Sequence, residues 1–558
     1  MRANKILLLV ASLGTLALLL VAVWRENVDR DWRRIQRDYR SRLEREAAAG
    51  FAVQLRQLYV PDLGATDRCI SCHVGMAPGE HGIAGDPVLG PHPDVAHDPA
   101  DFGCVVCHDG QGRATETADA HGSVMHWPHP MLPARHAWAG CGSCHTHVAV
   151  PRRVELAQGL ALVERNDCLA CHVLDGRGGT LRPGSAGVAA PDLSRVGARG
   201  FDRGWYDAHL ARHETAEAET NGPWRTSFGP IAAEDRALIE AYLGSRVGAP
   251  ELVTAKATFH ELGCRGCHKV AGVGGDDGPD LTHVGDKDPG QMDFHRVPER
   301  TLASWLAAHF RDPAAIVPGS RMPEMGLDER QIELLTFYML SLRRSDQPEA
   351  YWPKDRIRAE RFGEREFATD GATLWGTFCA ACHGPSGEGM RYPGAAAFPA
   401  AANPDFLAIA SDRFLRETIV HGRPGRRMPA WGESEGGLRR AEIDAVIAHL
   451  RSLGGVPAPR ETEPLRWVDG DAAAGAGLYA QACASCHGER GEGKEGPALA
   501  NPRFLAAASA AYLVESIRRG RRGTSMPAFG AASPTHRVLA DDEIVSIVSF
   551  MRTWEEPR

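Results

Sequence analysis

Three things are scarce in this 558-residue sequence: unpaired cysteine, excess positive charge and, over one long stretch, methionine. All 14 cysteines occur in pairs spaced C-x-x-C, and none is left over. Each pair is followed directly by histidine, which a framework of disulfides would not need. The net charge of −8 gives no sign of the basic surface that nucleic-acid binding requires, so we expect no nucleic-acid partner. No methionine occurs between Cys168 and Cys264.

The motif C-x-x-C-H, present seven times, is the attachment signature of c-type haem. Its two thiols add to the haem vinyl groups, and its histidine is the proximal iron ligand. A thiol redox pair or half a zinc site would explain a single copy, but seven identical patterns favour seven covalently bound haem c (heme c) groups. In chain order, sites 1 to 7 are Cys69/Cys72/His73, Cys104/Cys107/His108, Cys141/Cys144/His145, Cys168/Cys171/His172, Cys264/Cys267/His268, Cys379/Cys382/His383 and Cys483/Cys486/His487.

Residues 6–24, ILLLVASLGTLALLLVAVW, contain no charge. A helix of this length spans roughly 28 Å, enough to cross a bilayer. A cleaved signal peptide is the alternative, but its apolar region is usually shorter, and no convincing A-x-A site precedes Trp24. We therefore expect residues 1–25 to be a retained single-pass anchor in a bacterial inner membrane. Arg2 and Lys5 indicate a cytoplasmic start, which places the haem domains in the periplasm.

The next segment, residues 26–62, begins with dense charge. Trp32, Ile35, Tyr39 and Leu43 recur within it at helical spacing. This pattern predicts a charged helical stalk that lifts the haem domains off the membrane. A helix packed on a partner subunit and a plainly solvated helix are the alternatives.

The last four motifs belong to a repeat with a period of roughly 90–110 residues. In each unit a helix-like segment leads into C-x-x-C-H, a Gly- and Pro-rich loop follows, and a middle helix precedes a closing amphipathic helix. Three units have Met-Pro before the closing helix, in SRMPEM (320–325), RRMPAW (426–431) and TSMPAF (524–529). We therefore expect four domains, at 153–248, 249–346, 369–454 and 455–558, with a linker at 347–368.

This order of features resembles class I cytochrome c, a small all-α haem domain. The resemblance covers residues 155–558 and implies a mainly α fold: an N-terminal transmembrane helix, a loop-rich trihaem block, then four tandem all-α class I cytochrome c domains. It implies that a methionine sulfur is the distal iron ligand at three sites. The implied pairs are Met322 with His268, Met428 with His383 and Met526 with His487; Met325 competes with Met322 but lacks the following proline.

The resemblance also implies a contact behind the proximal histidine. The loop prolines Pro191, Pro279 and Pro497 would offer their carbonyl groups to the histidine ring N–H and so fix the ring.

Residues 63–152 differ from the repeat because three motifs lie within 77 residues, where three class I domains cannot fit. Eight histidines outside the motifs accompany them: His81, His92, His97, His121, His126, His129, His136 and His147. This density predicts bis-histidine ligation in a block that resembles small multihaem cytochromes. From the spacing, the distal ligand pool is His92, His97, His121 and His126, with one surplus.

The fourth unit lacks the methionine that its neighbours have. The matching stretch is RTSFGP (225–230), where Thr226 or Phe228 stands in place of methionine and neither is a credible iron ligand. Three explanations remain open: His209 or His213 of the middle helix is the ligand, a surplus histidine reaches across from the trihaem block, or the iron is five-coordinate.

Ligand identity predicts a gradient along the chain, because Met/His ligation raises the haem potential and a second imidazole lowers it. Low-potential sites would lie next to the anchor and high-potential sites towards the C-terminus.

This tandem arrangement is similar to that of cytochrome subunits of two kinds of complex. These are quinol-oxidising complexes of the bc or alternative type, and haem–copper oxidases. The resemblance implies an electron-transfer subunit with integral-membrane partners and a soluble cytochrome or cupredoxin, or an oxidase, as acceptor. The alternatives are a redox enzyme with an open site 4 and a conduit without a dedicated partner. Multihaem nitrite reductases often replace the motif histidine by lysine, and all seven motifs here end in histidine.

Overall fold

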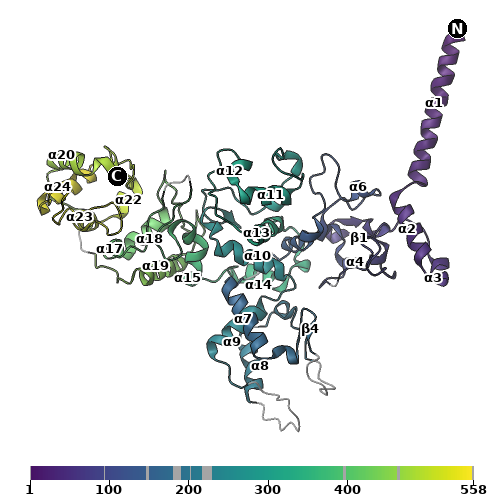
Figure 1. Ribbon diagram of the computed structural model, residues 1–558, viewed down its shortest axis with the longest axis horizontal. Coiled ribbons are helices and arrows are strands. Elements are labelled where there is room, and N and C mark those ends of the chain that lie inside the picture. Colours follow the sequence, from purple (N-terminus) through teal and green to yellow (C-terminus); the bar gives the residue numbers. More distant parts are fainter. Residues whose placement is uncertain are drawn as a thin grey trace.

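The computed structural model describes residues 2–93, 95–145, 150–179, 190–201, 203–215, 229–393, 397–461 and 465–555. Within these residues the fold is mainly α, with three short two-stranded sheets. The units form an elongated row (Figure 1), with α1 (Arg2–Asn27) at one end and the C-terminal unit at the other.

Helix α1 is long and apolar enough to cross a membrane by length and composition, and none of its apolar window is buried. After it, the chain forms two short helices, α2 (Asp31–Arg42) and α3 (Arg45–Gly50), in the segment predicted as a charged helical stalk. Tyr39 is 1% exposed and its hydroxyl donates to the His81 carbonyl at 2.8 Å. Gln36 donates to the Ser71 carbonyl, inside the site 1 motif, at 2.9 Å. The apolar stripe of the predicted stalk therefore packs against the trihaem block.

The trihaem block has little regular structure, as the sequence predicts. Strands β1 (Leu58–Val60) and β2 (Ala65–Asp67) pair antiparallel, with Leu58 opposite Asp67. The remaining elements are single turns and one longer 3-10 helix: η1 (Pro61–Leu63), η2 (Cys69–Ser71), η3 (Val74–Met76), α4 (Pro99–Phe102), α5 (Val105–His108), α6 (Thr117–Ala120) and η4 (Ala134–Ser143).

The site 4 unit is built on two helices that pack together, α7 (Arg153–Arg165) and α9 (Ala233–Gly244), around buried Val163 and Ile239. Gly159 allows their close approach, because a Cβ there would lie 2.4 Å from the Leu238 carbonyl oxygen. The other elements are η5 (Cys168–Ala170), β3 (Val173–Leu174), β4 (Arg177–Gly178), η6 (Val196–Arg199) and α8 (Arg203–Thr215).

The site 5 unit repeats this plan, with α10 (Pro250–Glu261) packed on α13 (Glu329–Ser341) through the buried rings of Phe259 and Tyr338, 4.8 Å apart. Its other elements are η7 (Cys264–Gly266), β5 (Lys269–Val270), β6 (Val273–Gly274), η8 (Val284–Asp286), η9 (Pro289–Gln291), α11 (Leu302–Arg311) and α12 (Pro313–Ile316).

The segment predicted as a linker, 347–368, is packed structure. It contains η10 (Glu349–Tyr351) and α14 (Lys354–Phe362), and Tyr351 contacts Phe102 of the trihaem block edge-on at 5.6 Å. Near its end, Glu366 accepts from the Lys256 ammonium at 2.6 Å and also pairs with Arg265. The segment thus joins three units.

The last two units share one hydrophobic core. Site 6 lies on α15 (Gly371–Leu374), the π-helical turn η11 (Trp375–Cys379), α16 (Ala380–His383), α17 (Pro404–Leu407), α18 (Asp412–His421) and α19 (Arg440–Gly454). Site 7 lies on α20 (Ala472–Ala482), α21 (Ala484–His487), α22 (Pro502–Ala507), α23 (Ala510–Arg519) and α24 (Asp541–Arg552).

The interface between these two units is reciprocal. Asn403 donates to the Arg522 carbonyl at 2.9 Å, and the matching Asn501 donates to the Pro424 carbonyl at 3.0 Å. Between them Phe414 stacks on Tyr512, the residue at the same repeat position, at 4.4 Å. Sites 6 and 7 therefore face each other as two related halves.

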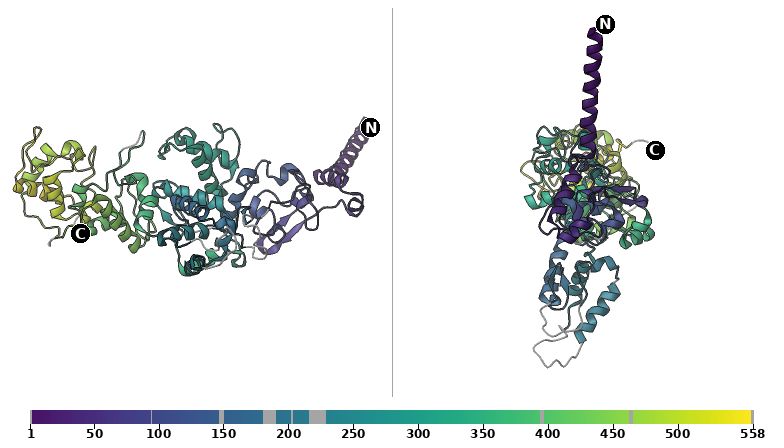
Figure 2. Two further views of the ribbon diagram at one scale, coloured as in Figure 1. Left: turned by 60° about the horizontal axis from the view of Figure 1, so that its bottom comes forward. Right: turned by 90° about the vertical axis from the view of Figure 1, so that its right-hand side faces the viewer.

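Order in space departs from order in sequence at the site 4 unit. This unit, with α7, α8 and α9, extends sideways from the middle of the row, away from the direction in which α1 projects (Figures 1 and 2). The trihaem block directly contacts the site 5 unit: a Cβ on Gly142, within the site 3 motif, would lie 2.1 Å from the Ser341 carbonyl oxygen of α13. It also approaches the site 4 unit, where a Cβ on Gly248 would lie 3.9 Å from the Ala96 side chain. The row therefore runs from the trihaem block to sites 5, 6 and 7.

Candidate haem-binding sites

Each C-x-x-C-H motif forms a compact turn. At six sites the histidine backbone N–H donates to the carbonyl of the first cysteine at 2.8 to 3.1 Å, and at site 6 the motif lies across η11 and α16. The structure describes all 14 cysteines, and all are free thiols. Among the described residues no three His, Cys, Asp or Glu side chains converge on a common metal position.

The structure distinguishes cysteines that the sequence pattern treats as equivalent. Thirteen of them are partly exposed, and Cys483 alone among the 14 is buried. The thirteen are Cys69, Cys72, Cys104, Cys107, Cys141, Cys144, Cys168, Cys171, Cys264, Cys267, Cys379, Cys382 and Cys486.

Site 7 shows this difference within one motif. Cys483, the first residue of the motif, is buried in the protein core, whereas Cys486 is partly exposed. The Ser485 hydroxyl donates to the Cys486 sulfur at 3.8 Å. The Cys486 carbonyl accepts from the Gly496 N–H at 2.9 Å and so ties the motif to the Gly-Pro loop. The two thiols of site 7 thus differ in environment, and haem attachment at Cys486, as at the other cysteines, stays a prediction.

In each unit of the repeat, a backbone carbonyl supports the motif histidine on the Nδ1 side of its ring. Each Nδ1 lies against a proline carbonyl: His172 with Pro191 and His268 with Pro279 at 2.8 Å, His383 with Pro399 and His487 with Pro497 at 2.9 Å. A carbonyl only accepts, so Nδ1 carries the proton and Nε2 is left as the ligand atom. The contacts predicted at Pro191, Pro279 and Pro497 are present. Pro399 lies beyond the GMRYPG stretch and was not predicted.

The glycine before the loop proline lets the loop reach the proximal ring. At Gly278 an added Cβ would lie 2.4 Å from a carbon of the His268 ring, and at Gly496 it would lie 2.8 Å from the His487 ring. Only glycine fits at such a distance. The pair Gly-Pro is therefore part of the histidine support at sites 5 and 7.

Burial suits these histidines to metal binding. It lowers the pKa of His73, His108, His145, His268, His383 and His487. The neutral imidazole is the form that binds iron.

Four proximal histidines have a second imidazole opposite them. The ring centroids are 6.4 Å apart for His73 and His121, 6.1 Å for His108 and His92, 6.2 Å for His145 and His97, and 6.2 Å for His172 and His209. A metal–nitrogen bond of about 2 Å on each side, plus roughly 1 Å from each nitrogen to its ring centre, separates two opposed imidazoles by about 6 Å. The four pairs thus have the spacing of two axial ligands on one iron.

The remaining candidates from the sequence lie elsewhere. His126 is exposed on a backbone with φ 70°, so it is the surplus member of its pool in this arrangement. The side chain of His213, together with His147, Thr226 and Phe228, lies outside the described residues.

The Met-Pro segments have a common local structure. Met428 and Met526 pack against the shared core, and their carbonyls accept from Arg423 at 2.9 Å and Arg521 at 3.0 Å. Met322 is half-buried, and its backbone N–H donates to the Ser320 hydroxyl at 3.2 Å.

Sequence reasoning missed a histidine on the middle helix of the site 5 unit. His309 lies on α11, and its ring stacks on Trp305 at 4.9 Å. The signal was the spacing W-x-x-x-H, which Trp205 and His209 share in the preceding unit.

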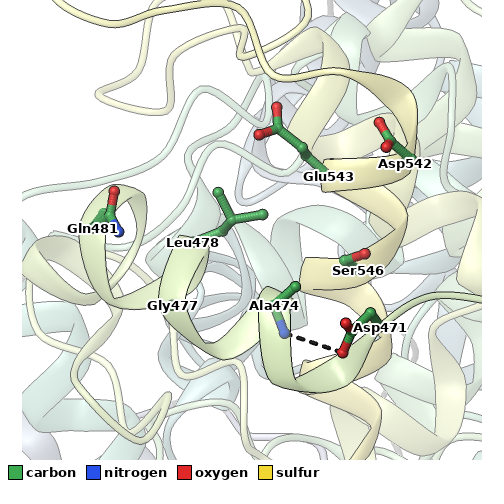
Figure 3. Close-up of a pocket in the computed structure, with 8 residues that line it drawn as sticks. All are labelled: Asp471, Ala474, Gly477, Leu478, Gln481, Asp542, Glu543 and Ser546. Atoms are coloured by element: carbon green, nitrogen blue, oxygen red, sulfur yellow. Dashed lines mark hydrogen bonds between the residues drawn. The ribbon is translucent and has the colours of Figure 1, made fainter.

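A shallow depression between α20 and α24 does not contribute to site 7 (Figure 3). It is lined by Asp471, Ala474, Gly477, Leu478, Gln481, Asp542, Glu543 and Ser546, none of which belongs to a haem motif or a Met-Pro segment. Asp471 caps α20 by accepting from Ala474 N–H at 3.1 Å. The acidic character of this depression therefore follows from helix capping.

Comparisons with known proteins match three parts of the chain to cytochrome families. Residues 252–343 and 368–454 match the family model for Cytochrome c, and residues 470–551 match Cytochrome C oxidase, cbb3-type, subunit III. A cbb3-type cytochrome c oxidase subunit FixP from Bradyrhizobium sp. is 35% identical over 30% of this chain and 56% of its own length. A subunit CcoP from Azospirillum sp. is 31% identical over 28% of this chain and 54% of its own.

The chain thus spans about half the length of the curated relatives it matches. A solved chain of the reducing HAO-like protein complex of Kuenenia stuttgartiensis is 19% identical, covers 33% of this chain and 96% of its own, and aligns with a TM-score of 0.23. The family matches cover less than half of the chain; with the all-α units and the repeated C-x-x-C-H motifs they support a multihaem c-type cytochrome.

Proposed function

We propose that this cytochrome is an electron-transfer subunit of a membrane respiratory complex, anchored by α1, with seven haem c groups on the periplasmic side. Haem c, once attached, supplies a one-electron redox couple at each site. The protein's own residues set the ligands, the supports and the spacing. The observation that carries the proposal is the set of four opposed imidazole pairs, because paired axial ligands serve electron transfer and leave no position for a substrate.

In this proposal the distal ligands are His121 at site 1, His92 at site 2, His97 at site 3 and His209 at site 4, with Met428 at site 6 and Met526 at site 7. Site 5 has two candidate distal ligands, Met322 and His309. The sites around the trihaem block would then have low potentials and the last two units high potentials.

Contacts between motifs support passage along the row. The thiols of Cys69 and Cys104 lie close enough to shift each other's pKa, and so do those of Cys267 and Cys382. A Cβ on Gly140 would lie 1.8 Å from the Cys107 carbonyl oxygen, which joins sites 2 and 3. These cysteines are where the haem edges attach, so sites 1, 2 and 3 and sites 5 and 6 adjoin through their attachment edges.

The relatives named as oxidase subunits favour an oxidase or a quinol-oxidising complex as partner. A soluble cytochrome or cupredoxin is the alternative acceptor. Isolation of the chain from membranes in mild detergent, followed by identification of co-purifying haem–copper or quinol-oxidising subunits, tests this partnership. Recovery of the cytochrome alone under all gentle conditions would count against it.

Electron paramagnetic resonance of the oxidised protein tests the ligand set. We expect low-spin bis-imidazole and low-spin Met/His signals and no high-spin iron. A stoichiometric high-spin signal would favour an enzyme with an open site, and sites 1 to 4 argue against that outcome because each has two facing imidazoles.

A further inference from the structure

The four C-terminal units divide into two classes at one position of the middle helix. His209 is the seventh residue of α8 and His309 the eighth of α11, and each follows a tryptophan by four residues. In the last two units the eighth residue of the middle helix is Ile419 or Ile517, where α18 and α23 begin after the matching caps Ser411 and Ser509. Site 5 therefore shares its middle helix with site 4, which has no methionine.

The tryptophan–histidine contact is the same in both units. Trp205 stacks on His209 with ring centroids 5.1 Å apart and planes 8° from parallel. Trp305 stacks on His309 at 4.9 Å and 12°. Such a stack fixes the orientation of the imidazole. At site 4 that orientation places His209 opposite His172, 6.2 Å away.

The half-buried ring of His309 lies near His268, the motif histidine of its own site. Its buried Nδ1 has no hydrogen-bond partner in the protein. Buried ring nitrogens are normally hydrogen-bonded, and a buried ring nitrogen without a partner occurs also at His145, the motif histidine of site 3, and at His136 and His260.

The methionine loop of site 5 has also changed. Met428 and Met526 each follow the middle-helix isoleucine by nine residues, whereas Met322 follows His309 by 13. The additional residues include α12 (Pro313–Ile316), capped by the Asp312 carboxylate, which accepts from Ala315 N–H at 2.9 Å. In this unit a longer stretch of chain thus separates the Met-Pro segment from the middle helix than in the two units that have isoleucine.

We propose that His309, and not Met322, is the distal iron ligand of site 5. Five of the seven sites then have two imidazole ligands, and Met/His ligation is confined to the two C-terminal units. The step from low to high potential falls between sites 5 and 6, whose Cys267 and Cys382 side chains are in contact. This inference rests on the proposed haem attachment at Cys264 and Cys267.

The test uses the full-length holoprotein and two matched substitutions, Met322→Leu and His309→Gly, with His295→Ala as control because that side chain is exposed in the same unit. Methionine bound to ferric haem gives a weak red absorption band that bis-imidazole haem lacks. We expect Met322→Leu and His295→Ala to leave this band and the resonance spectrum unchanged. A fall of the band by about a third in Met322→Leu, as loss of one of three methionine ligands would give, overturns the inference.

His309→Gly should convert one haem in seven to a high-spin form that binds carbon monoxide, and added imidazole should restore the low-spin form and displace the gas. An unchanged spectrum in His309→Gly would also overturn the inference. If this variant fails to fold, the Met322→Leu measurement still decides. Haem content distinguishes the two proposals: if Cys264→Ala with Cys267→Ala removes no haem, the attachment itself is wrong, whatever the distal ligand.

Discussion

The imidazole of His209 lies 6.2 Å from that of His172, ring centre to ring centre, in the one repeat unit that has no methionine. In the proposed ligand set, the middle helix α8 thus provides the distal ligand that the segment before the closing helix provides in the last two units. The Trp205 ring, parallel to that of His209 at 5.1 Å, holds the imidazole in this position.

Replacing His209 by alanine should open site 4. We expect the reduced wild-type protein to show almost no carbon monoxide shift, because each iron has two strong ligands. His209→Ala should bind about one equivalent of carbon monoxide and show a high-spin ferric signal. His126→Ala is the control, because this exposed histidine faces no proximal ring. Gas binding in the wild-type protein, or none in His209→Ala, would mean that the site 4 ligand lies elsewhere.

Replacing Met428 by histidine should keep the haem of site 6 attached, because attachment depends on Cys379 and Cys382. The potential of this site should fall by ~100 mV or more, since imidazole is the more basic ligand. A spectroelectrochemical titration resolves the shift, and the red absorption band of methionine ligation should lose intensity. The same potential with an undiminished band would show that another residue is the ligand.

Much of this architecture was predictable from the sequence because covalent attachment leaves a motif that needs no tertiary context. The seven motifs, the all-α repeat and the supports Pro191, Pro279 and Pro497 follow from local patterns. Distal histidines are different, since they are contributed from a distance: His97 lies 48 residues before His145, and only the fold brings the two rings together.

The contacts of the predicted stalk and linker could not be predicted from the sequence for a related reason. Dense charge at 25–50 favours a solvated helix as readily as a stalk, and in the structure charged residues of both segments have distant partners. Arg30 pairs with Glu116 at 2.8 Å, Arg42 with Asp86 at 2.8 Å, and Glu366 with Lys256 at 2.6 Å. Partners this far along the chain leave no periodic signal.

Replacing Glu366 by glutamine should weaken the junction between the site 5 and site 6 units. Lys256 and Arg265 are nearly fully buried, and both depend on this carboxylate. Removal of one partner of a buried ion pair typically costs about 3–5 kcal/mol. Thermal unfolding and hydrogen exchange across α10 measure the loss. Glu329→Gln, at an exposed pair with Arg311, should leave both unchanged.

The pH dependence of this junction has a definite sign. Burial alone would raise the pKa of Glu366, but Arg265 and Lys256 outweigh it, and the pKa lies well below its usual range. The stabilisation is therefore complete above about pH 4.5, where the unfolded carboxylate is ionised, and it declines as the pH falls towards the folded pKa. Glu366→Gln should remove this part of the acid sensitivity. Identical acid profiles for the two proteins would contradict this role.

Deletion of residues 1–27 should release a soluble protein that keeps seven haems, because α1 is not packed against the rest of the chain. Deletion of residues 1–44 should additionally weaken site 1, since it removes Gln36 and Tyr39, which bond to the block around Ser71 and His81. Haem content, and the mobility of site 1 in hydrogen exchange, compare the two. A shorter truncation that still sediments with membranes in high salt would indicate a second attachment, through a partner subunit.

The last prediction follows from the sideways position of the site 4 unit. The trihaem block contacts the site 5 unit directly, at Gly142 and Ser341 and through Arg343, which pairs with Asp109 beside the site 2 motif at 2.5 Å. Electrons therefore have a route from sites 1–3 to sites 5–7 that bypasses site 4.

Removing the site 4 haem with Cys168→Ala and Cys171→Ala should leave this route open. In a film tethered to an electrode by its N-terminus, the methionine-ligated sites should be reduced at the wild-type rate. Cys264→Ala with Cys267→Ala is the matched comparison, and it should slow their reduction sharply because it interrupts the row. Equal slowing in both variants would place site 4 in the path. A wild-type rate in the variant that lacks the site 4 haem would show that site 4 is a side branch of the electron path, suited to exchange electrons with a partner at the side of the molecule.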